Sequence, residues 1–200
     1  MLEGGEAVGK STQAALLAER LGAVLTREPG GTAVGEALRR LLLDLPLAPV
    51  PRAEALLMLA ARAQHVAEVI EPALAGGADV VCDRYSGSTL AYQGYGRGLP
   101  LDELEQINGW ATGHRAPDLV VLLEVPLEVA RQRLSSTTLD RIEAEGAEFL
   151  ARAQAGFRQL AAADPRRWQV VDASGSVEEV AERVWKTVDG AGAEDAGRSR

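Results

Sequence analysis

A glycine-rich loop near the start of the chain carries the clearest chemistry in this sequence. The residues Gly4-Gly5-Glu6-Ala7-Val8-Gly9-Lys10-Ser11 have the phosphate-loop spacing G-x-x-x-x-G-K-[ST]. Glycines allow positive φ angles and close backbone approach, so that consecutive N–H groups can point inward at phosphate oxygens. We expect Lys10 to reach the outer phosphates of a nucleotide and the Ser11 hydroxyl to hold Mg²⁺.

The scarcity of lysine supports this interpretation. Of the 21 basic residues only Lys10 and Lys186 are lysine, so the chain prefers arginine and yet places a compact point charge in the loop. The residues 11–21 read as a helix, whose positive N-terminal end adds to the anion site. The alternative is a glycine-rich turn before a surface helix, with a solvated lysine.

Two arginines follow predicted strands. Arg27 follows residues 23–26, read as a short buried strand, and Arg84 follows the apolar residues 79–83. Ligands of open parallel sheets bind beyond the carboxyl ends of the strands, so we expect both arginines beside the phosphate loop. Two arginines next to a triphosphate site imply a second anion; the alternative is that they are unrelated surface residues.

Asp83 is a candidate magnesium partner. It ends an apolar strand that should lie beside Ser11, and phosphate-binding loops hold the ion in this way, directly or through water. The alternative is that Asp83 caps a helix.

The elements that must position these residues alternate between strand and helix. This order predicts a three-layer α/β/α sandwich with a parallel sheet, formed by a single domain over residues 1–188. We expect a short polar lid around residues 134–141 and a disordered tail at 189–200. Besides the two strands above, we predict strands at 119–123 and 168–171, a loop with some helix at 86–98, and helices at 33–42, 53–74, 101–112, 126–134 and 140–163, with a last helix after a Ser176–Glu179 capping box. In the second of these helices, the predicted core stripe is Leu56, Ala60, Ala63, Ala67, Ile70 and Leu74.

The first strand is short. Only Met1, Leu2 and Glu3 precede the loop, although the first strand of such folds is central and its loss would expose core and unpaired edges. We therefore expect several further apolar residues upstream in the natural chain, which an intact mass of the natively expressed protein would test.

Composition narrows the classes of function. The formal net charge of -8 argues against nucleic-acid binding, which needs a basic face. The single cysteine, Cys82, excludes an internal disulfide and reads as a small core residue, and we treat His65 and His114 as structural. No membrane-length apolar stretch or secretory segment is present, which favours the cytoplasm and no membrane partner.

The chain resembles the thymidylate kinase family, whose members convert dTMP to dTDP. The resemblance covers most of the chain, from Glu3 to about Val188, and rests on six short motifs. They are Glu3-Gly4-Gly5-Glu6, Thr26-Arg27-Glu28-Pro29-Gly30-Gly31-Thr32, Arg62-Ala63-Gln64-His65, Asp83-Arg84-Tyr85 through Ser88, Ala91-Tyr92-Gln93-Gly94 and Asp140-Arg141-Ile142-Glu143. It implies a P-loop fold of the nucleoside monophosphate kinase type, ATP with Mg²⁺ as phosphoryl donor, dTMP as acceptor and a homodimer, for which the helices at 53–74 and 101–112 could supply a face.

The resemblance also implies roles for individual residues. Glu6 would contact the sugar 3′-hydroxyl, Tyr92 would lie under the deoxyribose, and Glu143 would lie near the nucleotide and its magnesium. Arg62 and Arg84 would grip the acceptor phosphate, with Arg27 and Glu28 close by. The residues implied for ATP are Gly4, Gly5, Glu6, Ala7, Val8, Gly9, Lys10, Ser11 and Thr12, and those implied for the base are Ser88, Thr89 and Gln93.

Two positions depart from the family pattern. Met58 stands where the family usually stacks a phenylalanine on thymine, which suggests weaker or less selective base binding. Val8 excludes an arginine inside the phosphate loop, and residues 135–139 hold no arginine either. We therefore expect Arg141, with Arg133 second, to act beside Lys10, Arg27 and Arg84 on the transferred phosphoryl group.

Other functions stay open at this point. The acceptor could be another nucleoside monophosphate, and a catalytically inactive relative is possible if the first strand is truly truncated. A nucleotide-dependent switch is disfavoured because the guanine-reading motif N-K-x-D is absent and a switch has no use for an acceptor-phosphate arginine pair. For adenine, residues 172–174 are a suggestion from their location after the last strand alone.

Overall fold

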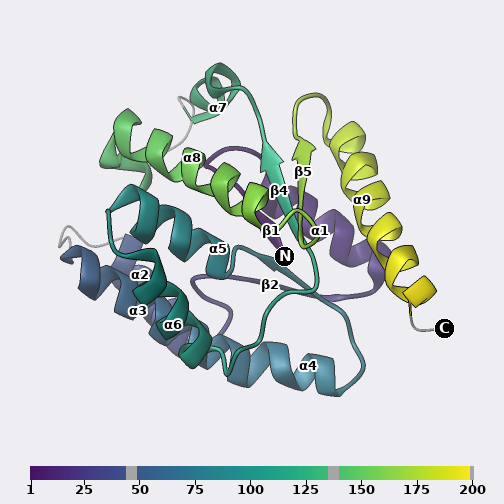
Figure 1. The fold of residues 1–200 in the computed structure, drawn as a ribbon, viewed down its shortest axis with the longest axis horizontal. Helices are drawn as coiled ribbons and strands as arrows, with labels where there is room; N and C mark the ends of the chain where they lie inside the picture. Colours follow the sequence, from purple (N-terminus) through teal and green to yellow (C-terminus); the bar gives the residue numbers. More distant parts are fainter. Residues whose placement is uncertain (44–48, 135–139, 199–200) are drawn as a thin grey trace.

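A five-stranded parallel sheet forms the centre of the molecule (Figure 1). The computed structural model describes residues 1–43, 49–134 and 140–198. The strand order β2-β3-β1-β4-β5 confirms the predicted parallel α/β class. The strands are β1 (Leu2–Glu3), β2 (Val24–Arg27), β3 (Val80–Asp83), β4 (Val120–Glu124) and β5 (Trp168–Asp172).

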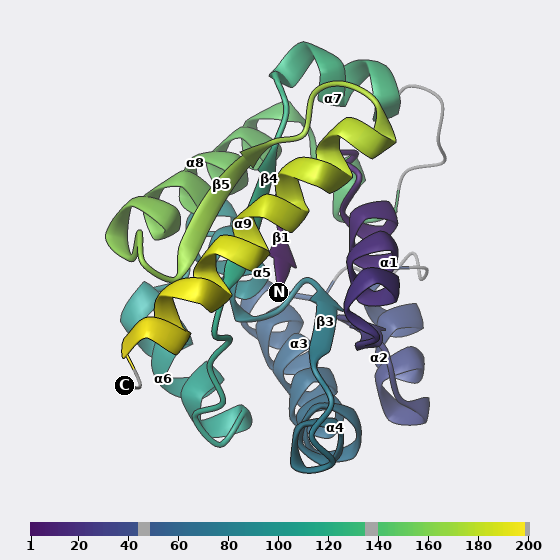
Figure 2. The same ribbon diagram turned by 90° about the vertical axis from the view of Figure 1, so that its right-hand side faces the viewer.

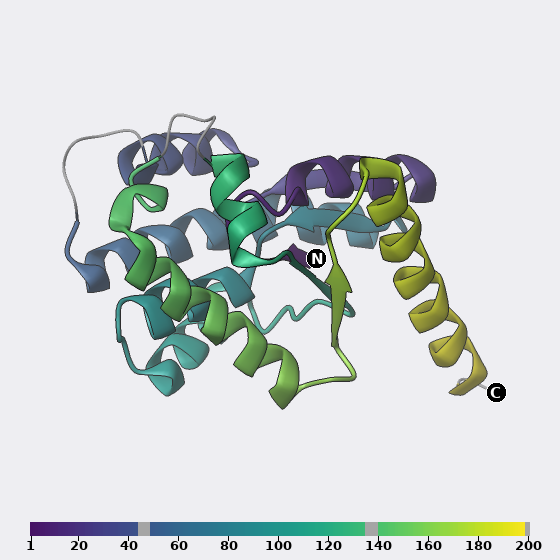
Figure 3. The same ribbon diagram turned by 90° about the horizontal axis from the view of Figure 1, so that it is seen from above.

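Helices cover both faces of the sheet, which gives three layers. The helices α1 (Lys10–Leu21) and α9 (Val177–Arg198) pack together on one face, where Leu17 and Val184 join the largest core cluster. Figure 2 views the sheet from the side of α9. In Figure 3, α8 (Ala147–Ala163) and α9 lie on opposite sides of β5.

The opposite face carries most of the remaining helical segments. Two of them are π-helical segments that continue a preceding α-helix, and one is a 3₁₀ turn. The segments are α2 (Ala33–Leu43), α3 (Pro51–His65), the π-helix Val66–Ile70, α4 (Glu71–Ala75), α5 (Ser86–Thr89), the π-helix Leu90–Gly96, α6 (Leu101–Ala111) and the 3₁₀ turn Glu143–Glu145. The helix α7 (Leu127–Leu134) follows β4 and packs Val129 and Ala130 against the core cluster of α1 and α9. In the described part of the chain, no helix is long and apolar enough to span a membrane.

The strand β2 differs from its prediction because it lies at the edge of the sheet. It pairs with β3 alone, and Leu25 is 50% exposed, so the expectation of a buried strand is wrong. The strand still carries Arg27 to the carboxyl edge, because Arg27 pairs in register with Asp83.

The predicted core stripe of the helix at 53–74 is confirmed at its C-terminal end, where Ile70 is 1% exposed, but wrong at its N-terminal end. Leu56 is 61% exposed, whereas Ala55, Leu59 and Arg62 are buried. The helical segments are interrupted by the π-helix just before Pro72, a residue that lacks the N–H needed for the regular ladder. A single helical period therefore does not describe which residues face the core.

Three further segments depart from the sequence prediction. Residues 86–96 are helical throughout, although we expected a loop with some helix. The helix predicted at 140–163 begins only at Ala147, because Gly146 has φ 95°, outside the helical region. The helix α9 continues to Arg198 through most of the segment predicted to be disordered, although that segment contains three glycines.

The central strand β1 is only two residues long. Leu2 is fully buried and lies between Asp83 of β3 and Val121 of β4, and the Met1 ammonium donates to the carbonyl of Leu119 at 2.7 Å. The expectation of further residues upstream stays a prediction. The Ser176–Glu179 capping box is confirmed by its two reciprocal hydrogen bonds, of 2.9 and 3.2 Å.

Candidate active site

A cavity of about 430 Å³ opens where β1, β2 and β3 end, as the sequence predicted. Its volume is in the usual range for small-molecule sites. Most of the predicted site residues line it. They are Glu6, Ala7, Gly9, Lys10, Ser11, Thr12, Arg27, Met58, Arg62, Asp83, Arg84, Ser88, Thr89, Tyr92, Gln93 and Glu143, together with Glu28, Pro29, Arg39, Leu43, Asp140 and Ile142.

The phosphate loop joins β1 to α1 and needs its glycines. Gly4 has φ 143°, and a side chain there would collide with the carbonyl oxygen of Leu123. Gly9, at φ 89°, directly precedes α1. Both conformations suit glycine and turn the backbone toward the cavity. Val8 instead packs into the core, where it is only 5% exposed.

Lys10 is a buried cation at the end of this loop. It is 6% exposed, and its Nζ donates to the carbonyl of Gly5 at 2.5 Å. Burial lowers the pKa of Lys10, and the neighbouring Arg84 lowers it further, to about 8, although Glu6 and Asp83 act in the opposite direction. A bound phosphate anion would stabilise the charged form of Lys10 against both burial and the repulsion from Arg84, so the site favours binding of an anion.

Ser11 and Asp83 meet across the loop. The Ser11 hydroxyl donates to Asp83 Oδ2 at 2.5 Å, and Asp83 Oδ1 is buried without a hydrogen-bond partner. An unsatisfied carboxylate oxygen beside a hydroxyl suits a hard cation such as Mg²⁺. No group of three or more metal-binding side chains occurs within residues 1–43, 49–134 and 140–198, so the other ligands of such an ion would be phosphate oxygens and water.

Arg84, Glu6 and Tyr92 form a second polar cluster that lines the cavity. Arg84 has φ 71°, which is unusual for a residue with a side chain, and its Nη2 donates to Glu6 Oε1 at 2.5 Å. The Tyr92 hydroxyl donates to the same oxygen. Burial acts to raise the pKa of the Glu6 carboxyl, but Arg84, Lys10 and these hydrogen bonds outweigh it and lower the pKa to about 2.

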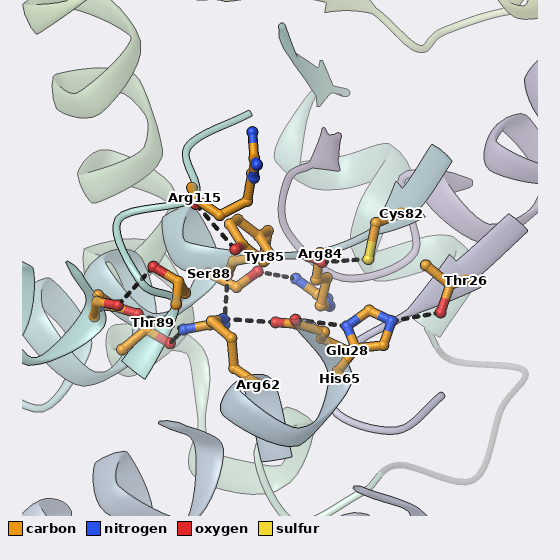
Figure 4. Close-up of polar contacts among 12 residues, drawn as sticks. Thr26, Glu28, Arg62, His65, Cys82, Arg84, Tyr85, Ser88, Thr89 and Arg115 are labelled. Atoms are coloured by element: carbon orange, nitrogen blue, oxygen red, sulfur yellow. Dashed lines mark hydrogen bonds and ion pairs between the residues drawn. The ribbon is translucent and has the colours of Figure 1, made fainter. Parts of the chain in front are cut away.

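Arg62 is held in a buried chain of polar contacts (Figure 4). Its Nε donates to Glu28 Oε2 at 2.7 Å, and the other oxygen of Glu28 meets His65 Nδ1 at 2.8 Å. His65 Nε2 in turn meets the Thr26 hydroxyl at 2.6 Å. His65 is fully buried and does not line the cavity, in keeping with the structural role predicted for it, but the imidazole also orients Glu28, a carboxylate that does line the cavity.

Most of the donor groups of Arg62 are already used. Besides Glu28, they contact the Thr89 hydroxyl at 2.8 Å, Asn108 Oδ1 at 2.5 Å and the Tyr85 carbonyl at 2.8 Å. A guanidinium has five N–H groups, so one is left for a ligand. Arg62 and Arg84 were predicted to grip the acceptor phosphate together. Arg62 has fewer N–H groups left for that phosphate than Arg84 has.

Four residues expected at the base line the same cavity. Met58 contributes an apolar surface from α3. The Ser88 hydroxyl donates to Glu3 Oε2 at 2.6 Å, the Thr89 hydroxyl accepts from Arg62, and Gln93 Nε2 donates to Glu54 Oε1 at 2.9 Å. Protein contacts thus fix the direction of each polar group before any ligand binds.

The two arginines at the edges of the predicted lid lie in different places. Arg141 does not line the cavity: its Nε donates to the Leu42 carbonyl and its Nη2 to Glu54 Oε2, at 2.7 and 2.6 Å. Arg133, our second choice, donates to the carbonyl of Ala7 in the phosphate loop at 3.2 Å. The lid itself stays a prediction, since residues 135–139 lie outside the described residues.

Other charged residues complete the wall. Arg27 lines the cavity but is more than half exposed and pairs with Glu36 at 3.0 Å. Arg39, which the sequence analysis missed, also lines it and donates to the Pro29 carbonyl at 2.9 Å. Its position on α2, four residues before the end of the helix, gave no signal in the sequence. Glu143 also lines the cavity, and burial raises the pKa of its carboxyl. Residues 172–174, suggested for adenine, do not line this cavity.

The parallel sheet, the phosphate loop and the acceptor-side arginines define a P-loop kinase of the nucleoside monophosphate kinase type. Comparison with known proteins gives the family. The family model described as thymidylate kinase matches residues 2–184. The chain therefore belongs to the thymidylate kinase family, and it is an enzyme.

Individual relatives agree with this assignment. The thymidylate kinase of Synechococcus sp. (strain JA-3-3Ab) is 55% identical, over 94% of this chain and 93% of the relative. That of Thermomicrobium roseum is 50% identical over 93% and 91%. Among solved structures, thymidylate kinase from Ehrlichia chaffeensis has a TM-score of 0.78 and 31% identity, with 94% of this chain and 96% of that chain covered.

Proposed function

We propose that this chain transfers the γ-phosphoryl group of ATP to dTMP, giving ADP and dTDP, with Mg²⁺ as cofactor. Family membership supports the reaction. The observation that supports it most directly is that one cavity is lined both by Lys10, Ser11 and Asp83 and by the Glu6–Arg84–Tyr92 cluster. Such a cavity can bring a phosphate donor and a phosphate acceptor together.

The donor phosphates would bind the loop from Gly4 to Thr12. Its backbone N–H groups and the N-terminus of α1 supply partial positive charge, and Lys10 supplies a full charge. Arg133, which already contacts the loop at Ala7, would add a second cation near the transferred group. These groups stabilise charge and position, which is the main task in phosphoryl transfer.

The magnesium ion would be held by Ser11 and Asp83, with Glu143 as a more distant acidic neighbour on the same cavity. When bound, Mg²⁺ neutralises charge on the phosphate oxygens of the donor. The unpaired Asp83 Oδ1 and the short Ser11–Asp83 contact support this assignment.

The acceptor dTMP would bind beside the Glu6–Arg84–Tyr92 cluster. Arg84, with Arg27 nearby, would receive its phosphate, and Glu6 would accept a hydrogen bond from its 3′-hydroxyl. The ring of Tyr92 would pack against the deoxyribose, and Met58 would cover the base. A phosphate monoester loses its second proton near about pH 6, so the attacking oxygen is already anionic and the chain needs no general base.

Asp83→Asn tests this proposal. Formation of dTDP, followed by anion-exchange chromatography, should fall by at least about 100-fold, and excess Mg²⁺ should restore part of the rate if the ion is bound more weakly. The matched control is Asp79→Asn, which changes an exposed aspartate at the other end of the same strand and should leave the rate unchanged. A normal rate and a normal Mg²⁺ dependence in Asp83→Asn would remove the metal assignment, and absence of dTDP from the unmodified enzyme would remove the function.

We also propose a homodimer that uses the face formed by α3 and α6. These helices pack against each other, and they expose Leu56 at 61% and Trp110 at 82%. Trp110→Glu should convert the dimer to a monomer in light scattering, whereas Val177→Glu, at an exposed apolar residue of α9, should not. An unmodified chain that is monomeric at micromolar concentration would contradict this proposal. The cytoplasmic location stays a prediction from the sequence.

A further inference from the structure

The most buried carboxylate beside the cavity is Glu54, which none of the roles above uses. It lies on α3, is 0% exposed, and does not itself line the cavity. A carboxylate in such a place is costly unless its charge is balanced and its lone pairs are satisfied. Both conditions are met here.

Four hydrogen bonds satisfy the Glu54 carboxylate. Its Oε1 accepts from Gln93 Nε2 at 2.9 Å and from Arg97 Nε at 3.1 Å. Its Oε2 accepts from Arg97 Nη2 at 2.9 Å and from Arg141 Nη2 at 2.6 Å. Burial acts to raise the pKa of Glu54, but these donors outweigh it and the pKa is lowered, so the group stays ionised.

Glu145 completes a ring with the same two arginines. It contacts Arg97 Nη2 at 2.5 Å and Arg141 Nη1 at 3.5 Å, but it does not contact Gln93. The ring of Glu54, Arg97, Glu145 and Arg141 therefore balances two negative and two positive charges. Among the side-chain hydrogen bonds of the residues that the structure describes, the bond from Gln93 to Glu54 joins this ring to a side chain that lines the cavity.

This contact fixes which end of the Gln93 amide faces Glu54. An ionised carboxylate can only accept hydrogen bonds, so the end of the amide that faces it must be the NH₂ group. The carbonyl end, Oε1, then points away from Glu54. Gln93 lines the cavity, and its Oε1 accepts no hydrogen bond from the residues that the structure describes. The side chain thus offers the cavity an acceptor and not a donor.

We propose that Glu54 is a positioning residue for base selectivity: by holding the NH₂ group of Gln93, it presents Gln93 Oε1 to the N3–H of thymine. The inference rests on the proposed function. Thymine and uracil carry a donor at N3, whereas neutral cytosine carries an acceptor there. With Oε1 fixed in place, a cytosine base would bring its N3 acceptor against the Oε1 acceptor of Gln93, and neither would have a donor. A site built to receive a donor therefore binds cytosine much more weakly than thymine.

Glu54→Gln should turn the Gln93 amide round, so that it presents a hydrogen-bond donor to the cavity in place of an acceptor. The Oε2 position faces two arginine donors, whereas the Oε1 position faces one arginine and Gln93. The new carbonyl will therefore occupy the Oε2 position, and the new NH₂ group will face Gln93. Gln93 can satisfy that donor only by turning its own carbonyl toward it, which presents NH₂ to the cavity.

The measurement is the ratio of kcat/KM for dTMP to kcat/KM for 5-methyl-dCMP. These two acceptors share the sugar, the phosphate and the 5-methyl group, so that the ratio reports the hydrogen-bonding edge of the base. We expect Glu54→Gln to lower the ratio by about 30-fold or more, because dTMP loses an acceptor while 5-methyl-dCMP gains a donor.

Glu145→Gln is the matched control. It removes one charge from the same ring without touching Gln93, so any effect of ring stability alone will appear in it as well. We expect its ratio to stay within about threefold of the unmodified enzyme. In a Gln93→Leu background, Glu54→Gln should no longer change the ratio, because the two residues act as one unit.

A measurement on the unmodified protein covers the case in which Glu54→Gln does not fold. The side-chain amide protons of Gln93, assigned by their loss in Gln93→Leu, should exchange slowly with deuterium when they are held on buried Glu54. Rapid exchange would overturn the proposal, and so would an unchanged ratio in a folded Glu54→Gln. If the unmodified enzyme does not phosphorylate dTMP at all, the proposed function fails instead.

Discussion

Replacing Arg62 by methionine tests whether the buried polar chain around it holds the site together. Arg62 is 3% exposed and its partner Glu28 is 4% exposed. Methionine keeps most of the stem but removes the guanidinium, which leaves Glu28 with His65 as its remaining described partner and removes the donors to Thr89 and Asn108.

The size of the effect follows from burial. Breaking a buried ion pair by removing one partner costs about 3–5 kcal/mol. For a chain of this size that is a loss of roughly 6–20 °C in melting temperature. Urea unfolding followed by circular dichroism gives the free energy directly.

Arg27→Met is the matched control, because it also removes an arginine from the cavity wall. Its pair with Glu36 is largely exposed, with side chains 54% and 37% accessible, so the expected loss is below about 1 kcal/mol. Equal losses for the two variants would refute the reasoning that burial decides the role of Arg62.

Three further predictions concern catalysis. Lys10→Ala should lower kcat by at least about 100-fold with unchanged circular dichroism, and a near-native rate would exclude Lys10 from transfer. Because the pKa of Lys10 is lowered to about 8, its charge is lost as the pH rises through that value, so kcat/KM for ATP should fall above about pH 8. Lys10→Arg should remove this alkaline fall, and a profile that it does not alter would show that another group titrates. Tyr92→Ala should narrow the preference for deoxyribose over ribose acceptors, and an unchanged ratio would show that Tyr92 does not select the sugar.

The features that could be predicted from the sequence are local in origin. The phosphate loop depends on glycine conformations and on the lysine and serine that follow them, and these are visible in eight consecutive residues. Asp83 and Arg84 could be placed because the carboxyl ends of parallel strands meet at one edge of the sheet. Tertiary structure adds nothing that changes these assignments.

The contacts that could not be predicted depend on partners far away in the chain. Arg141 has a long flexible stem, and its direction is decided by Glu54, which lies 87 residues earlier. His65 gains its place from Glu28 and Thr26, on a different element. No periodicity or motif contains such pairings, because they arise only when the elements pack.

The same reason explains the misplaced core stripe of α3. A regular helical period assumes one buried side, but α3 packs against both α2 and α6 and is followed by a π-helical turn. Leu56 is left exposed, while charged Glu54 is fully buried because arginines from two other segments balance it. Burial here follows charge pairing and not hydrophobicity alone.

The central claim is most directly tested by ADP release from ATP and Mg²⁺ in the presence of different nucleoside monophosphates. The acceptors are dTMP, dUMP, dCMP, dGMP and the ribose form of TMP, with a reaction without acceptor as the baseline. We expect a strong response to dTMP. The response to dUMP measures how well a site with Met58 beside the base distinguishes thymine from uracil. Release that is equally slow with every acceptor and without any would contradict the central claim.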